Sequence, residues 1–261
     1  MAELLVWPVL LAYGEAAVAY AGDVRSPGRL GRLATWGVRI GWLAQTALLA
    51  AQAIRAEGFP WDSWAGSLNL FVWLVVGAYL IWGCRPRYRL LGLVVMPLAA
   101  LLLAVSYAAG GVGSSGETRY STFFLVAHVG LVLSAFAGLT LAAALAALYL
   151  WEERELKRRS RSILSRRAPS LATLDALVAR TITVALVLLT LGMAAGFARV
   201  RERSDLDPLI AVTLLTWAVY GAFLGLRYGA GWRGRRAALV ALAGFALVVA
   251  LRFGLPATHF A

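Results

Sequence analysis

Two histidines are the side chains in this sequence best suited to hold a metal ion. His128 lies in the apolar run "FFLVAHVGLVLSAF", and His259 lies near the end of the chain in "GLPATHFA". Two neutral imidazoles suit the axial positions of a haem iron. A zinc ion would need a third protein ligand from a loop carboxylate, either Asp207, Asp205 or Glu117. Each histidine could equally be an ordinary polar residue, bonded inside a helix bundle or solvated on a tail.

The segments that must position these histidines are strongly apolar. Of the 261 residues, 61% are hydrophobic and 15% are charged, whereas soluble domains usually carry about 25% charged residues. A membrane core about 30 Å thick needs roughly 20 apolar residues per helix. The sequence predicts eight such spans, at 2–21, 33–55, 63–83, 88–108, 121–151, 177–199, 207–227 and 235–254. We therefore expect an all-α fold, a polytopic transmembrane helical bundle that forms one membrane domain over residues 1–261.

The basic residues indicate how this bundle is oriented. The net charge is +12, and the basic residues concentrate in the first, third, fifth and seventh loops between the predicted spans. Short loops rich in arginine and lysine stay on the cytoplasmic side. The distribution therefore predicts that both termini face outward. We interpret the run "KRRSRSILSRR", residues 157–167, as a topology signal that attracts anionic lipid, and not as a nucleic-acid site.

This topology places both histidines at the outer face. His128 is about two turns inside the fifth span, and His259 follows the end of the eighth span. The seventh span begins at Asp207 and Pro208, a pair typical of a helix start, because the carboxylate can cap free N–H groups. Asp207 could instead orient a bound ligand. Trp217 lies ten residues further along, too deep for an aromatic belt at the membrane surface, and could line an apolar cofactor pocket.

Three stretches in the second half of the chain resemble one family. They are "LVAHVGLVLSAFAGLTLAAALAALYLWEERELK", residues 125–157, then "LDPLIAVTLLTWAVYGAFLGLR", residues 206–227, and finally "GWRGRRAA…GF", residues 231–245, followed by a span and a terminal His-Phe. In this order they resemble the cytochrome c assembly (CcsA/HemX/YpjD-like) family of haem-handling membrane proteins. The resemblance runs from about residue 60 to the end of the chain.

The resemblance implies a haem site. In that family two outward-facing histidines are thought to ligate haem on either side of a tryptophan-rich loop, which by position implies His128 and His259 as the two metal ligands. Asp207 and Trp217 match the family pattern in the second stretch. The implied cofactor is a non-covalent, b-type haem. The implied partners are membrane lipid and other cytochrome c assembly or haem-synthesis proteins, with no nucleic acid, in the inner (cytoplasmic) membrane of a bacterium.

The chain departs from the family where that loop would lie. The family's Trp-Asp-Pro-Lys-Glu is replaced here by Leu-Asp-Pro-Leu-Ile at residues 206–210, and the histidine of the family's "YLH" is replaced by Gly225. These changes favour the short eight-span HemX/YpjD branch and an auxiliary protein that catalyses no bond change. The predicted function is assistance to cytochrome c assembly or haem homeostasis. The alternatives are a haem-free scaffold or regulator of the same fold and, from another class, a small-solute transporter.

Overall fold

The protein is helical throughout the part that the structure describes. The computed structural model describes residues 3–25, 28–55, 61, 63–83, 89–111, 122–158, 169–197 and 208–254. A short 3-10 turn, Glu3–Leu5, precedes eight α-helices: α1 (Val6–Arg25), α2 (Arg29–Arg55), α3 (Trp64–Gly83), α4 (Arg89–Ala108), α5 (Thr122–Lys157), α6 (Leu171–Phe197), α7 (Pro208–Tyr228) and α8 (Arg235–Gly254). The described residues contain no strand, which confirms the all-α prediction.

Each helix overlaps one predicted span, but several helices extend beyond it. α2 begins at Arg29 and not at 33, α5 continues to Lys157 and not to 151, and α6 begins at Leu171 and not at 177. Hydropathy marks the apolar core of a membrane, whereas backbone hydrogen bonds continue through charged residues outside it. The ends of the apolar runs therefore underestimate the lengths of these helices.

Within the described residues five helices, α3 to α7, are long and apolar enough to cross a membrane. The chain is thus a multi-pass membrane protein. The other three helices are more polar; α2, for example, contains Arg32, Arg39, Gln45 and Gln52 within one helix. That the chain crosses the membrane eight times, and that both termini lie on the outer side, remain predictions.

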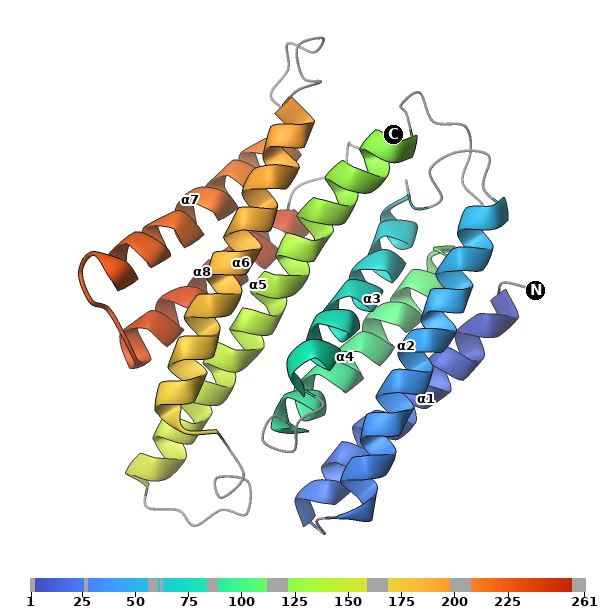
Figure 1. The fold of residues 1–261 in the computed structure, drawn as a ribbon, viewed down its shortest axis with the longest axis horizontal. Helices are drawn as coiled ribbons and strands as arrows, with labels where there is room; N and C mark the ends of the chain where they lie inside the picture. The colour runs from blue at the N-terminus through green and yellow to red at the C-terminus, as the bar shows by residue number, and fades with distance from the viewer. Residues whose placement is uncertain are drawn as a thin grey trace. The chain divides into compact units, whose positions relative to one another are not determined.

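The chain divides into two compact units, each built from four helices. Unit 1 comprises Met1–Thr122 with Arg161–Pro169, and unit 2 comprises Phe123–Ser160 with Ser170–Ala261. In unit 1, α1 packs against α2 and α4, and α3 packs against α4 and α2 (Figure 1). In unit 2, α7 packs against α6 and α8 (Figure 1). The single membrane domain predicted from the sequence stays a prediction.

A row of buried amide side chains crosses unit 1. The Tyr13 hydroxyl donates to Gln45 Oε1 at 2.7 Å, and Gln45 Nε2 donates to Asn69 Oδ1 at 2.9 Å. Asn69 Nδ2 then donates to Gln52 Oε1, and Gln52 Nε2 donates to the Gly111 carbonyl, each at 3.1 Å. The four side chains are all buried. Because an unpaired amide inside an apolar bundle is costly, this row selects one arrangement of α1, α2 and α3.

The turn after α4 completes this row. The Gly111 N–H donates to the Ser106 carbonyl at 2.8 Å, and the Ser106 hydroxyl donates to the Ala65 carbonyl at 2.7 Å. A Cβ atom at position 111 would lie 2.4 Å from the Ala65 carbonyl oxygen, so only glycine fits. The preceding Gly110 has a φ of +79°, a conformation that glycine adopts without strain. The two glycines thus hold the end of α4 against the start of α3.

Candidate functional site

His128 lies on the second turn of α5 and contacts α6. Its Nδ1 is 2.8 Å from the carbonyl oxygen of Gly192, and the side chain is half-buried. The next turn of α6 presents Gly196, where a Cβ atom would lie 2.7 Å from the imidazole Cε1. The ring therefore rests on Gly196, while a Cβ at Gly192 would lie 2.8 Å from Val132, so the two glycines, four residues apart, let α5 approach α6 closely. This spacing is typical of close helix contacts in membranes.

The hydrogen bond to Gly192 determines which ring nitrogen is free. A carbonyl oxygen only accepts, so Nδ1 carries the proton, and in the neutral imidazole Nε2 then has an available lone pair. Metal-ligating histidines commonly donate their other N–H to a backbone carbonyl, which fixes the orientation of the ring. Phe124, one turn earlier on α5, stacks on the imidazole with ring centroids 5.9 Å apart and planes 3° apart. The bond and the stacked ring therefore hold the imidazole in one orientation, with Nε2 as its unprotonated nitrogen.

Two of the predicted site residues lie outside the part of the chain that the structure describes. These are His259, the proposed second ligand, and Asp207. α7 begins at Pro208, in agreement with the helix start predicted from that pair of residues. The pairing of His128 with His259 stays a prediction. Among the described residues no three His, Cys, Asp or Glu side chains gather around one point, and the acidic residues considered as zinc ligands are not described.

Trp217 contacts a different part of α6. Its indole Nε1 donates to the Thr190 hydroxyl at 2.9 Å, and that hydroxyl donates to the Leu186 carbonyl at 2.8 Å. Thr190 and Gly192 are two residues apart, which separates them by about 200° around a helix. The structure thus places Trp217 and His128 on opposite sides of α6 and does not bring the two side chains together.

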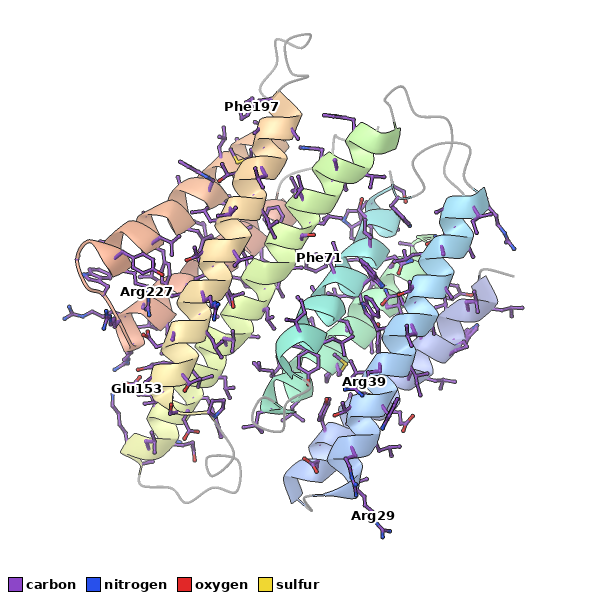
Figure 2. The ribbon with its side chains drawn as sticks, viewed as in Figure 1. Arg29, Arg39, Phe71, Glu153, Phe197 and Arg227 are labelled. Atoms are coloured by element: carbon purple, nitrogen blue, oxygen red, sulfur yellow. The ribbon has the colours of Figure 1, made fainter. Side chains whose placement is uncertain are left out.

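A largely buried ion pair at the other end of unit 2 was not predicted from the sequence. Arg227, near the end of α7, donates to both carboxylate oxygens of Asp175 on α6, at 3.0 and 2.8 Å (Figure 2). The Gly234 N–H, just before α8, also donates to Asp175, at 2.8 Å. Arg227 is only 9% exposed. This carboxylate therefore joins α7 and the start of α8 to α6, the helix whose Gly192 carbonyl bonds to His128.

One sequence signal could have revealed the contact of His128 with α6. "GMAAG", residues 192–196, has two glycines four residues apart in an apolar helix, the pattern that lets a neighbouring helix approach closely. The ion pair had a weaker signal, because Asp175 and Arg227 are 52 residues apart and nothing in their neighbourhoods links them.

Together these observations define a multi-pass helical membrane protein with an oriented histidine in its C-terminal unit. Residues 61–258 match the protein family described as "Cytochrome C assembly protein". Because the match covers most of the chain, from just before α3 to just after α8, the protein belongs to this family. The resemblance recognised in the sequence is confirmed.

The relatives carry two kinds of name. The chain is 29% identical to the cytochrome c biogenesis protein CcsA of Prochlorococcus marinus (strain MIT 9303), covering 81% of this chain and 77% of the relative. It is 28% identical to CcsA of Microcystis aeruginosa, covering 94% and 89%. It is also 27% identical to protein HemX of Brevibacillus brevis, covering 84% and 83%. No solved structure matches the chain.

Proposed function

We propose that this protein binds haem through His128 and His259 and assists cytochrome c assembly or haem homeostasis. The observation that carries the proposal is the bond from Nδ1 of His128 to the Gly192 carbonyl, which leaves Nε2 as the metal-binding atom. Relatives named for cytochrome c biogenesis, and one named HemX, support the same function. The chain has a single cysteine, so it lacks the cysteine pair that attaches haem covalently. We therefore propose a non-covalent, b-type haem.

The residues have different roles in this proposal. His128 is fixed by its helix and by α6, whereas His259 approaches the iron from the C-terminal tail. Asp207, at the start of α7, interacts with a haem propionate through a bridging donor. Trp217 contributes by tying α7 to α6, the helix on which the His128 ring rests. Haem held by two imidazoles is a reversible complex, and we expect the protein to catalyse no bond change itself.

The proposed setting follows from the orientation of the chain. We propose that the protein lies in the inner membrane of a bacterium, with both termini and the haem site on the outer side. There it would cooperate with other cytochrome c assembly or haem-synthesis proteins. A haem-free scaffold of the same fold, or a small-solute transporter, would show the same helices without the iron chemistry.

The absorption spectrum of the purified, detergent-solubilised protein tests the proposal. We expect a Soret band and the spectrum of a six-coordinate, bis-imidazole iron. Because the chain has only two histidines, the variants His128→Ala and His259→Ala test both ligands. Each should leave a five-coordinate, loosely held haem, with the larger loss for His128. A haem-free preparation that remains so after reconstitution, or a spectrum unchanged in His128→Ala, would refute the site.

Asp207→Asn separates helix capping from ligand binding. Asparagine caps a helix about as well as aspartate but carries no charge. Loss of haem at unchanged expression and helical content would support the role with a propionate. Unchanged haem content would assign Asp207 to the helix start alone.

A further inference from the structure

A hollow between the C-terminal end of α5 and the first turns of α8 lies well away from His128. Its volume is about 190 Å³. Six residues line it: Leu150, Glu153, Arg154, Lys157, Arg235 and Leu239. A water molecule in the liquid occupies about 30 Å³, so the hollow has room for a group several times larger. Glu153, which Figure 2 labels, lies on the same helix as His128 and 25 residues beyond it. At 1.5 Å per residue the two are roughly 38 Å apart along the helix.

Cations dominate the polar side of this hollow. Lys157 Nζ lies 2.7 Å from one oxygen of Glu153, and Arg235 Nε lies 3.8 Å from the other oxygen. The carboxylate thus draws together two cations from different helices. Arg154 also lines the hollow, so its lining residues include three cations and one anion. Lys157 and Arg235 remain 62% and 59% exposed, so their other N–H groups can reach a ligand.

The apolar side of the hollow follows the same two helices. Leu150 lies one turn before Glu153 on α5, and Leu239 lies one turn after Arg235 on α8. Both leucines lie toward the apolar parts of their helices; Leu239 is 45% exposed and supplies most of this surface, whereas Leu150 is largely buried. The hollow therefore crosses the boundary between the polar and apolar parts of the bundle. A soluble anion would need only the cations, whereas a phospholipid would also use the leucines.

We propose that this hollow binds the phosphate headgroup of an anionic phospholipid. Arg154, Lys157 and Arg235 contact the phosphate, and the acyl chains run along Leu150 and Leu239. Basic pockets between membrane helices bind anionic headgroups in this way. In the predicted topology the hollow faces the cytoplasmic leaflet. A lipid bound there would link α5 to α8 at the end opposite to the proposed haem site, and the proposal does not depend on haem binding.

Lipid titration of the purified full-length protein tests this site. Phosphatidylglycerol and phosphatidylcholine with the same acyl chains are added in detergent, and bound lipid is counted by native mass spectrometry. We expect phosphatidylglycerol to bind preferentially. The double variant Lys157→Gln/Arg235→Gln should weaken its binding roughly tenfold or more, since each cation near a membrane surface contributes about a fivefold gain in affinity. Arg29→Gln/Arg32→Gln, which removes two exposed arginines at the start of α2, is the matched control and should bind as the wild type does.

A substitution that should strengthen lipid binding completes the test. Glu153→Gln removes the competing carboxylate and keeps all three cations, so it should strengthen binding of phosphatidylglycerol severalfold. Equal binding of both lipids, an unchanged Lys157→Gln/Arg235→Gln variant, or no gain in Glu153→Gln would each overturn the proposal. Inorganic phosphate is the third arm of the experiment. If it displaces phosphatidylglycerol at millimolar concentration, the hollow is a site for soluble phosphate and the lipid assignment is wrong.

Discussion

The substitution Gly196→Ala tests the placement of the His128 ring. An added Cβ would lie 2.7 Å from the imidazole Cε1 and 3.1 Å from Nδ1. Ordinary van der Waals contact begins at 3.4 Å, so the ring must retreat by about 0.7 Å (3.4 minus 2.7). A movement of that size lengthens the 2.8 Å bond to the Gly192 carbonyl or breaks it. Loss of such an outer partner typically lowers metal affinity about 10- to 100-fold.

The assay is a haem titration of purified protein, with the Soret band and the unfolding temperature measured on the same samples. We expect Gly196→Ala to bind haem at least about tenfold more weakly while remaining folded, because alanine in place of glycine stabilises a helix by roughly 0.8 to 1 kcal/mol. Gly130→Ala is the matched control. It lies on α5 two residues after His128, and a Cβ there meets no described atom within 4 Å.

The haem affinities of these two variants show whether haem binding needs the contact of the His128 ring with α6. If Gly196→Ala binds haem as tightly as Gly130→Ala, the ring does not need its place against α6, and the proposed ligand geometry is refuted. If both variants lose haem equally, the loss comes from a general disturbance of the helices and not from the displaced imidazole.

Three further predictions concern the helical frame and its orientation. Asn69→Ala leaves Gln52 Oε1 without its donor and should lower the free energy of unfolding by about 2 to 4 kcal/mol, measured by denaturant titration in detergent. Asp175→Asn replaces the charge-assisted pair with Arg227 by a weaker bond and should lower the stability of unit 2 by roughly 1 to 3 kcal/mol, visible as faster proteolysis of the C-terminal half. A reporter fused after Ala261 should be active only on the outer side of the membrane, and activity on the cytoplasmic side would separate His128 from the C-terminal histidine.

The helices were predictable because hydropathy is a local property of the sequence. Each apolar run is long enough to form a helix by itself, so the eight overlaps follow without knowledge of any contact. Asp207 and Pro208 likewise predicted where α7 begins, since helix starts depend on neighbouring residues. The helix lengths were underestimated because charged residues such as those at the end of α5 continue a helix beyond the apolar run.

The contacts between helices were not predictable in the same way. His128 was recognised from the sequence as a candidate ligand. Its bond to Gly192 and its contact with Gly196 depend on which face of α6 is turned toward α5, and no local sequence pattern determines that face. The proposed role of Trp217 beside a cofactor stays a prediction, and the structure shows its indole bonded to Thr190 on the side of α6 away from His128. A sequence gives the type of each residue and its position along a span, whereas the face that a helix turns toward another helix depends on the surrounding helices.

The hydrogen bonds along the row of amides in unit 1 all run in one direction, which is fixed by the Gly111 carbonyl at its end. The Gly111 carbonyl can only accept, so Gln52 must present its nitrogen there and its oxygen to Asn69. Asn69 is then obliged to offer its oxygen to Gln45, which in turn offers its oxygen to the Tyr13 hydroxyl. The Gly111 carbonyl thus determines which way the terminal amides of Gln52, Asn69 and Gln45 are turned, on two helices. A glutamate in place of Gln52 would still accept from Asn69, but it would set a second oxygen against the Gly111 carbonyl, so the row would lose its bond to the turn after α4 while its later bonds kept their direction.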